Sequence, residues 1–430
     1  MAFASLEEWL RWQEGLHSAQ IDLGLERITP IARRLGLQRS DALRIVIAGT
    51  NGKGSCAAFL RQIYGRAGWR VGVYTSPHLL NYNERIVRLG QAAPDEEICA
   101  AFEAVNAQRA DVPLTYFEFG TLAALQIFAN HALHVQILEV GLGGRLDAVN
   151  LVDADCTLIT PISIDHEAWL GTSRERIAEE KAPTMRAGAP AVLAEIDPPR
   201  TLLAYAEQLG ACTVRAGIDY QWRDGQDVWH WQWQHATSRR LPKPALPGRH
   251  QLDNAAAAVA TVQILQDKLA VPASAIEHGV ASAQLLGRAT SVPGEVETIL
   301  DVAHNPAGTR ALAEFLATSA SGGKTRAVIG MMHDKPHRET IAALASQVDS
   351  WYVCELPDQR ALGAAELAYL VQATTQAPAH CHASVAEAYG SSRNSSYPGD
   401  RILVCGSFVT VAEAFNTVPE LSEFASALNG

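Results

Sequence analysis

The chain has 430 residues, of which 48% are hydrophobic and 19% are charged, so its composition is that of a globular protein with room for two or three cores. Its formal net charge of −11 argues against a nucleic-acid partner, because binding to nucleic acids depends on cationic contacts to phosphates. The acidic amphipathic N-terminus is not a signal peptide, no apolar run spans a membrane and the seven cysteines form no CxxC pair, so we expect a cytoplasmic protein with no membrane partner.

The first predicted strand runs into a glycine-rich loop in the sequence RIVIAGTNGKGS, residues 44–55. Four loop residues suit a phosphate: Gly49, Gly52, Lys53 and Gly54. Glycines let backbone N–H groups converge on an anion, Lys53 adds a positive charge, and Ser55 offers a hydroxyl to Mg²⁺. The spacing differs from the standard G-x-x-x-x-G-K-[ST] motif, but an apolar strand precedes the loop and a helical pattern follows it. This context predicts a nucleotide-phosphate site.

Strands and helices alternate after this loop, with strands expected at 70–75, 135–140 and 156–160 and helices at 95–109 and 117–132. Such alternation predicts a mostly parallel sheet, in which ligands bind beyond the carboxyl ends of the strands. Ser76, Glu139 and His166 stand at such strand ends, so we expect them near the phosphate loop. Hydroxyl and carboxylate oxygens suit Mg²⁺, and imidazole is the less usual third ligand.

A tryptophan-rich segment, WRDGQDVWHWQW, occupies residues 222–233. Its period of two places Trp229, Trp231 and Trp233 on one face of a strand. A stacking platform for a flat ligand and a half-buried β-hairpin both explain this pattern. We favour the hairpin, because it requires no ligand.

Helices expected at 253–269 and 273–286 precede a second alternating series, with strands at 296–302, 326–331, 351–355 and 401–405 and helices at 306–317 and 338–347. We place the domain boundary between residues 291 and 292, so that residues 1–291 carry the phosphate loop and residues 292–430 form a smaller α/β domain. The second domain has no glycine-rich phosphate loop of its own. We therefore expect it to share a ligand site with the first domain.

Two further groups of polar residues stand out. Lys181 follows two carboxylates in EEKAP, and this spacing alone favours a solvated helix face. Asp301, His304 and Asn305 stand at a strand end in ILDVAHNPAG. No G-x-S-x-G elbow accompanies them, which argues against a Ser/His/Asp hydrolase and favours contacts to a nucleotide or a second substrate.

Nine motifs occur in one order: GTNGKGS, TSPHL, LEVGLGGRLDAVN, DHEAWLG, EEKAP, LPGRHQLDNAAAA, LDVAHNP, GMMHDK and VCGSF. In these motifs, from about residue 17 to residue 410, the chain resembles the Mur ligase superfamily. Within it the resemblance is to the folylpolyglutamate synthases, above all the bifunctional bacterial dihydrofolate synthase/folylpolyglutamate synthases. The resemblance implies an α/β fold, with a P-loop-type ATPase domain of mostly parallel sheet followed by a smaller Rossmann-like domain.

The resemblance implies sites for ATP and for Mg²⁺, with two ions expected. It places the ATP phosphates on Thr50, Asn51, Gly52, Lys53, Gly54 and Ser55, and further ATP contacts on Asn254, Arg288 and Asp301. It places Mg²⁺ on Ser55, Ser76, Glu139 and His166. It makes Lys181 a carbamylated lysine that supports the second Mg²⁺, against the interpretation from spacing alone. The family often has Ala-Gly after EEK, whereas Pro183 follows Ala182 here, so we expect the helix to bend just after Lys181.

The resemblance also implies where the organic substrates bind. His304 and Ser407 match residues near the glutamate and the acyl phosphate. The residues that match the pterin-binding loops are Asp22, Leu23, Thr115, Tyr116, Phe117, Glu118, Leu146, Asp147 and Ala148. The candidate catalytic residues are Lys53, Lys181, Arg288, Asp301 and His304.

The implied activity is that of an ATP-dependent ligase. It joins L-glutamate to dihydropteroate and to folates through an acyl phosphate and releases ADP and phosphate. Narrower alternatives are a folylpolyglutamate synthase alone and another Mur-type amino-acid ligase. More remote are a P-loop small-molecule kinase, which transfers phosphate without glutamate, and a nucleotide-binding switch, which binds tightly with little turnover. We expect small-molecule substrates and a monomer.

Overall fold

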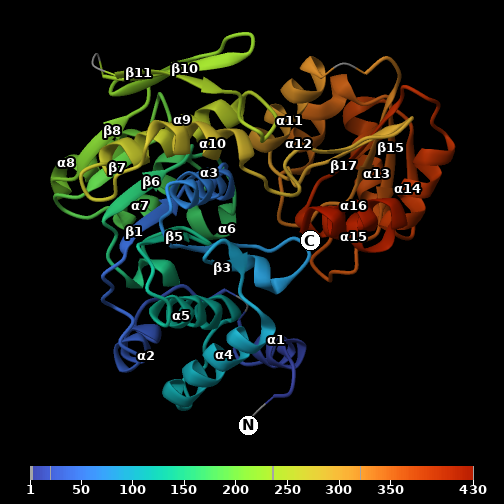
Figure 1. Cartoon of the computed structure of the whole chain (residues 1–430). Helices are drawn as coiled ribbons and strands as arrows, with labels where there is room; N and C mark the ends of the chain where they lie inside the picture. The colour runs from blue at the N-terminus through green and yellow to red at the C-terminus, as the bar shows by residue number, and fades with distance from the viewer. Residues whose placement is uncertain (1–2, 20, 235–236, 320, 430) are drawn as a thin grey trace. The chain divides into compact units, whose positions relative to one another are not determined.

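The structure is a computed structural model that describes residues 3–19, 21–234, 237–319 and 321–429. The chain divides into two compact units, Met1–Ala245 with Leu252–Ala283 and Leu246–Gln251 with Gln284–Gly430 (Figure 1). Residues 284–291 thus lie with the second unit, whereas the sequence analysis placed them in the first domain. Their place follows from β12 (Thr290–Val292), which pairs with β13 (Glu297–Leu300) of the second unit.

An eight-stranded sheet forms the centre of the first unit, in the order β4-β3-β2-β5-β1-β6-β7-β8. Its parallel strands are β1 (Leu43–Ala48), β2 (Val71–Tyr74), β5 (Val135–Glu139), β6 (Cys156–Ile159), β7 (Pro190–Leu193) and β8 (Cys212–Arg215). Its antiparallel edge consists of β3 (Ile86–Arg88) and β4 (Gln91–Ala92). Every residue of β1 and β5 is buried, because both faces of a parallel sheet are covered, and this explains why most of their residues are apolar. The four strands predicted here, now β1, β2, β5 and β6, are confirmed, whereas β3, β4, β7 and β8 were not predicted.

The α-helices of this part of the chain are α1 (Leu6–Glu14), α2 (Ile28–Arg34), α3 (Lys53–Arg66), α4 (Asp95–Arg109), α5 (Tyr116–Ala129), α6 (Glu167–Leu170), α7 (Arg174–Lys181), α8 (Arg200–Leu209), α9 (His250–Ile264) and α10 (Ala273–Ser282). Its 3₁₀ helices are η1 (Tyr82–Arg85), η2 (Ala148–Leu151) and η3 (Ala182–Thr184). The N-terminal α1 packs through Trp9, which is fully buried, with its ring centroid 5.7 Å from that of Phe102 and 6.3 Å from that of Phe119. This aromatic core fixes the N-terminal helix to α4 and α5.

The tryptophan-rich segment forms an antiparallel sheet of β9 (Tyr220–Arg223), β10 (Val228–Trp233) and β11 (Thr237–Pro242). Trp229 and Trp231 are fully buried. Their indole N–H groups donate to the carbonyl of Pro242 at 2.8 Å and to the carbonyl of Ala256 at 3.2 Å. The half-buried hairpin is confirmed, and Trp231 holds it to α9.

A second sheet, in the order β12-β13-β17-β14-β15-β16, forms the second unit. Its parallel strands are β13, β14 (Thr325–Ile329), β15 (Ser350–Cys354), β16 (Ala379–His382) and β17 (Arg401–Cys405). Its helices are α11 (Pro306–Thr318), α12 (His337–Leu344), η4 (Ala345–Gln347), α13 (Ala364–Thr375), α14 (Val385–Asn394), α15 (Phe408–Thr417) and α16 (Pro419–Asn429). The predicted strands and helices are confirmed, but β12, α13, β16 and α14 were not predicted. All residues of the edge strand β16 are partly or fully exposed, so it lacks the apolar run that marks the other strands.

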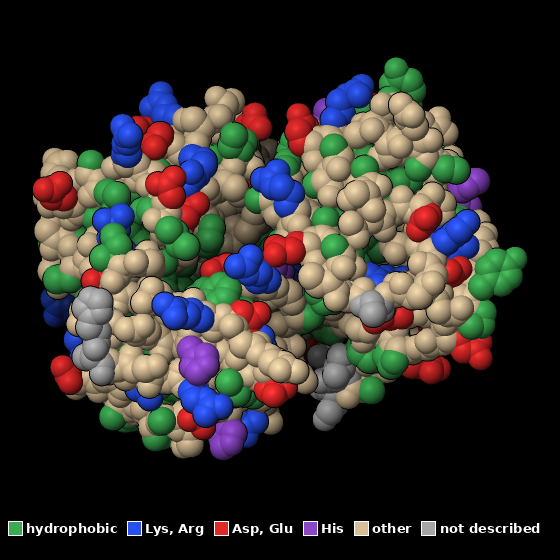
Figure 2. Space-filling view, turned by 90° about the horizontal axis from the view of Figure 1, so that it is seen from above, with side chains coloured by type: hydrophobic (Ala, Val, Ile, Leu, Met, Phe, Trp, Pro, Cys, Tyr) green, Lys and Arg blue, Asp and Glu red, His purple; other side chains and the backbone are tan. Residues whose placement is uncertain are grey.

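Figure 2 shows one face of the molecule, on which lysine and arginine side chains are interspersed with aspartate and glutamate. Both signs are present on this face although the chain as a whole has an acidic excess, with 35 basic and 46 acidic residues. Within the described ranges, no helix is both long enough and apolar enough to cross a membrane.

Candidate active site

The glycine-rich loop joins β1 to the N-terminus of α3. Gly52 precedes the helix with a φ of 94°, a conformation that suits glycine, and a Cβ atom there would lie 2.3 Å from Oδ1 of Asn254. Asn254 of α9 therefore lies against the loop. Thr50 anchors the other side, since its N–H donates to the carbonyl of Pro161 at 3.0 Å and its hydroxyl donates to the carbonyl of Ser163 at 3.0 Å. The first N–H groups of α3 stand at the loop and suit an anion.

Lys53 is the first residue of α3, and its ammonium group folds back over the loop. It donates to the carbonyl of Gly49 at 3.2 Å and to the carbonyl of Thr50 at 3.1 Å. The loop thus curves around a positive charge next to a helix N-terminus. A nucleotide phosphate is the kind of group that such a cradle binds.

Ser76 and Glu139 come together at the ends of neighbouring strands. Glu139 is buried at the end of β5, and its Oε2 accepts a hydrogen bond from the N–H of Ser76 at 3.3 Å. His166 follows β6 and is the N-cap residue of α6, with a left-handed φ of 52° that is rare for a residue with a side chain. Ser55 is buried in the first turn of α3. These residues supply the hard oxygen donors that Mg²⁺ prefers, together with one imidazole.

Lys181 is the last residue of α7 and is only 4% exposed. The solvated helix face suggested by the EEKAP spacing is therefore wrong. Its Nζ donates to the carbonyl of Gly143 at 3.4 Å. Burial, and then the charge of Lys53, lower the pKa of Lys181 to about 7, against the opposing charges of Asp147 and Asp165. The structure thus brings a lysine amine that is partly neutral near pH 7 close to the charge of the phosphate loop.

The α-helix that carries Lys181 ends where the sequence predicted a bend. The 3₁₀ helix η3 begins at Ala182 and contains Pro183, which cannot donate an N–H to a continuing helix. A Cβ atom at Gly144 would lie 2.7 Å from the carbonyl of Glu180, so the end of α7 packs closely on the glycine loop after β5. This packing buries Lys181.

The residues that match the pterin-binding loops gather around the first turn of α5. Thr115 caps this helix, and Glu118 completes a capping box with it. Phe117 is half-buried, with its ring centroid 5.9 Å from that of Tyr74. Tyr116 opens α5, while Leu146 lies on the loop before η2 and Ala148 begins that helix.

Asp147 is almost fully buried between Leu146 and η2. Its two carboxylate oxygens accept from the N–H of Leu142 and the N–H of Val149, both at 2.9 Å. Burial raises the pKa of Asp147 to about 6, although these hydrogen bonds oppose the shift. Backbone N–H groups of neighbouring residues thus hold the carboxyl group of Asp147 in one position.

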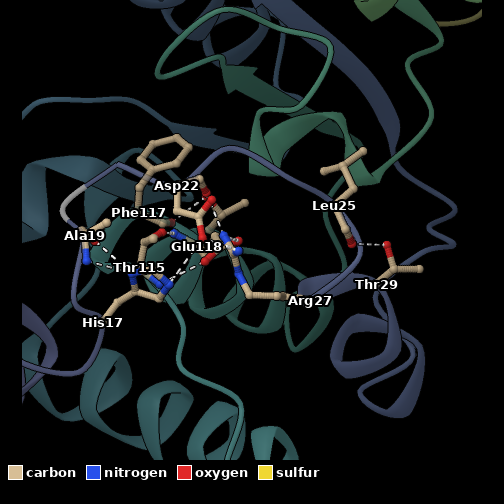
Figure 3. A network of polar contacts seen from close by, with 10 residues as sticks. His17, Ala19, Asp22, Leu25, Arg27, Thr29, Thr115, Phe117 and Glu118 are labelled. Atoms are coloured by element: carbon tan, nitrogen blue, oxygen red, sulfur yellow. Dashed lines mark hydrogen bonds and ion pairs between the residues drawn. The ribbon is translucent and has the colours of Figure 1, made fainter. Parts of the chain in front are cut away.

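Asp22 and Leu23 lie on the segment before α2. Figure 3 shows Asp22 beside Arg27, whose guanidinium donates to Asp22 Oδ2 at 2.5 Å and to Glu118 Oε1 at 2.9 Å. Sequence reasoning named Asp22 and Glu118 but missed Arg27. Arg27 ends the segment HSAQIDLGLER, residues 17–27, which resembles a pterin-binding loop, but its pairing with Glu118 has no signal in the sequence, because the two residues are 91 positions apart.

The second unit gathers its candidate residues at the carboxyl end of β13. The carboxylate of Asp301 accepts from the N–H of Ala289 at 2.7 Å and from the N–H of Ala303 at 2.8 Å. Burial raises the pKa of Asp301, and the charge of Arg288 opposes this shift. Arg288 itself lies 5.4 Å from the ring centroid of Phe408. Phe408 was not predicted and serves as a shared packing surface.

His304 follows Asp301 on the same strand end. Its Nδ1 lies 2.8 Å from the carbonyl of Val302, which can only accept, so Nδ1 carries the proton. Its ring centroid lies 6.2 Å from that of Phe408. Ser407 caps α15, since its hydroxyl accepts from the N–H of Thr410 at 3.0 Å. Arg288, Asp301, His304 and Ser407 therefore belong to one region of the second unit.

Comparison with known proteins decides the family. The model of the Mur ligase glutamate ligase domain matches residues 287–408. The dihydrofolate synthase/folylpolyglutamate synthase of Escherichia coli strain K12 is 40% identical over 417 residues, which are 97% of this chain and 96% of that protein. The chain belongs to the dihydrofolate synthase/folylpolyglutamate synthase family.

Solved structures of this family match the whole fold. FolC from E. coli in complex with DHPP and ADP has a TM-score of 0.92 at 40% sequence identity and covers 100% of both chains. A bifunctional folylpolyglutamate synthase/dihydrofolate synthase with Mn, AMPPNP and L-glutamate bound has a TM-score of 0.90 at 42% identity, over 97% of this chain and 99% of that chain. The predicted α/β Mur ligase fold and the class of ATP-dependent ligase are confirmed.

Proposed function

We propose that this enzyme joins L-glutamate to dihydropteroate and, in a second activity, to folates, with ATP as the source of free energy. The observation that carries the proposal is the match over the full chain to bifunctional enzymes whose structures hold DHPP with ADP, and AMPPNP with L-glutamate. The phosphate loop around Lys53 supports the use of ATP. The expectations of a monomer in the cytoplasm, with no nucleic-acid or membrane partner, stay predictions.

The reaction proceeds through an acyl phosphate. A carboxylate resists attack by an amine, so a carboxylate oxygen of the pterin substrate first attacks the γ-phosphorus of ATP and displaces ADP. The amine of glutamate then attacks the acyl carbon, the tetrahedral intermediate loses phosphate, and the amine nitrogen loses a proton. No nucleophile from the protein is required. The work of the protein is to position the substrates and to stabilise negative charge.

ATP binding is assigned chiefly to the glycine-rich loop. The residues proposed to hold the phosphates are Thr50, Asn51, Gly52, Lys53, Gly54 and Ser55. The left-handed φ of Gly52 turns the chain into α3, whose N–H groups suit an anion. Asn254, which lies against Gly52, is a further contact to the nucleotide. Lys53 places its charge where the transferring phosphoryl group carries negative charge.

The donor set fits divalent cations. The residues that would hold Mg²⁺ are Ser55, Ser76, Glu139 and His166, with the carbamate of Lys181 at a second ion. Glu139 and Ser76 are in contact, and the buried Lys181 is neutral often enough near pH 7 to take up CO₂. Bound Mg²⁺ supplies positive charge that neutralises the phosphate oxygens during transfer.

The pterin ring is assigned to the first turn of α5 and the segments around it. The proposed contacts are Asp22, Leu23, Thr115, Tyr116, Phe117, Glu118, Leu146, Asp147 and Ala148. Phe117 offers a half-buried aromatic face, and Asp147 offers a rigid carboxyl group. These are the two kinds of group that a flat, polar heterocycle requires.

The second unit is assigned the acceptor end of the reaction. We propose that Arg288 and Asp301 contact the nucleotide and that His304 and Ser407 act near glutamate and the acyl phosphate. The hydrogen bond from Nδ1 to Val302 fixes the ring of His304. A ring held in one orientation can position a substrate, and this role does not require it to act as a base.

The assay for the proposed function measures phosphate release from ATP and Mg²⁺ with dihydropteroate, with and without glutamate. Release is expected only when both organic substrates are present, together with a glutamylated product. Replacing dihydropteroate by a reduced folate tests the second activity. A phosphorylated pterin formed without glutamate would instead indicate a kinase, and tight ATP binding without turnover would indicate a switch.

His304→Ala is expected to impair glutamate ligation far more than nucleotide binding, because His304 acts at the acceptor end while Lys53 and Ser55 hold the phosphates. The measurements are the dissociation constant for a non-hydrolysable ATP analogue and the glutamate-dependent turnover, made on the same preparation. His380→Ala, at an exposed histidine of β16, is the matched control. Equal loss of binding and turnover, or loss of neither, would remove His304 from the acceptor site.

A further inference from the structure

Arg27 joins two parts of the candidate pterin site that are far apart in the sequence (Figure 3). It stands at the start of α2, after the segment that carries Asp22. Its Nη1 donates to Asp22 Oδ2 at 2.5 Å, and its Nη2 donates to the carbonyl of Asp22 at 2.6 Å and to Glu118 Oε1 at 2.9 Å. One guanidinium group therefore binds both the side chain and the backbone of Asp22 and links them to α5.

The carboxylate of Glu118, which Arg27 binds, is itself held in one position. Only 5% of its side chain is exposed, and its second oxygen, Oε2, accepts from the N–H of Thr115 at 2.8 Å. The N–H of Glu118 donates in return to the hydroxyl of Thr115 at 3.2 Å. The carboxylate is thus fixed by the helix cap on one side and bound by Arg27 on the other.

Asp22 is the more exposed partner, since 41% of its side chain is accessible to solvent. His17 Nε2 lies 3.3 Å from the same Oδ2 atom that Arg27 binds. Two carboxylates near each other repel, so Asp22 and Glu118 require a cation between them. A guanidinium presents several N–H groups in a fixed plane and can bind both at once, whereas an ammonium is a point charge without this geometry.

We propose that Arg27 is a positioning residue for the pterin substrate. It holds Asp22 and the neighbouring Leu23 against the first turn of α5, where Phe117 and Glu118 lie. This inference rests on the proposed function and specifically on the assignment of these residues to the pterin. Arg27 acts through Asp22 and Glu118, so its loss raises the concentration of pterin substrate required and leaves the ATP site as it is.

The test compares Arg27→Lys and Arg27→Met with the unmodified enzyme. Steady-state assays measure KM for dihydropteroate and KM for ATP, and a thermal melt measures the fold. KM for dihydropteroate is expected to rise about tenfold in Arg27→Met, with a smaller rise in Arg27→Lys, and KM for ATP to change less than about twofold. Arg33→Met, at an exposed arginine of the same helix, is the control and should change neither constant.

The outcomes separate this inference from the proposed function. If the unmodified enzyme shows no turnover that depends on dihydropteroate and glutamate, the proposed function fails and the inference falls with it. If the unmodified enzyme is active but both variants keep its KM for dihydropteroate, or raise both KM values equally, Arg27 is not a positioning residue for the pterin. If Arg27→Met does not fold, Arg27→Lys, which retains the positive charge, decides by the same two constants.

Discussion

Lys53→Ala is expected to lower ligase turnover by about 10²-fold or more, because it removes the charge that stabilises the transferring phosphoryl group. Lys53 donates to the carbonyls of Gly49 and Thr50, so its side chain stands over the loop that we assign to the phosphates. Alanine is a good helix former at the start of α3, and the fold should survive. The measurements are turnover with dihydropteroate and glutamate, and a thermal melt.

Lys268→Ala is the matched control for this prediction. Lys268 lies in the same unit but is exposed, and its ion pair with Asp155 at 3.5 Å is a surface contact of small energy. Its turnover should equal that of the unmodified enzyme. If Lys53→Ala also retained near normal turnover, the assignment of the glycine-rich loop to the phosphates would be wrong.

Lys181→Ala is expected to abolish most activity, and a short carboxylic acid at high concentration should restore part of it. The neutral amine of Lys181 attacks the carbon of CO₂ and loses a proton, which gives a carbamate with the oxygen ligands that an ammonium group lacks. An added carboxylate can occupy the space that the truncated side chain leaves and replace those oxygens. Lys53→Ala should gain nothing from the same acid, because the role of Lys53 requires a positive charge.

The pH dependence of this modification follows from the pKa of about 7 for Lys181. Burial favours the neutral amine, so the reactive form predominates above this pKa and the protonated form below it. Activation of CO₂-depleted enzyme by bicarbonate should therefore weaken as the pH falls below about 7. An unmodified ammonium group at Lys181 in a well-ordered structure loaded with Mg²⁺ and nucleotide would contradict the prediction.

Much of the fold could be predicted from the sequence because its parallel strands are buried on both faces. Strands such as β1 and β5 then appear as short, mainly apolar segments between helical patterns. The segment from α13 to α14 was not predicted, because its strand β16 lies at the edge of the sheet and carries polar and partly exposed residues. A strand with one open edge and few buried side chains has no distinct pattern in the sequence.

The sequence was sufficient to name those candidate site residues that directly follow a predicted strand or belong to a recognisable motif, such as the glycine-rich loop. Spacing alone gave the wrong environment for Lys181, because burial there depends on how the end of α7 packs on Gly144. The segment that ends at Arg27 was matched to a pterin-binding loop, but the role of Arg27 could not be predicted, since its ion pair with Glu118 spans 91 residues and appears only when α5 and the segment before α2 are folded together. Long-range ion pairs are a product of tertiary structure and leave no local pattern.

The most direct test of the central claim follows one oxygen atom. Dihydropteroate with heavy oxygen in its carboxylate is incubated with the enzyme, ATP, Mg²⁺ and glutamate, and the released phosphate and the pterin product are examined by mass spectrometry. An acyl phosphate passes one carboxylate oxygen to the phosphate when the amine displaces it, so the account predicts one heavy oxygen in each released phosphate and an amide-linked glutamate in the product. Unlabelled phosphate beside an amide product, or a labelled phosphorylated pterin without an amide, would contradict it.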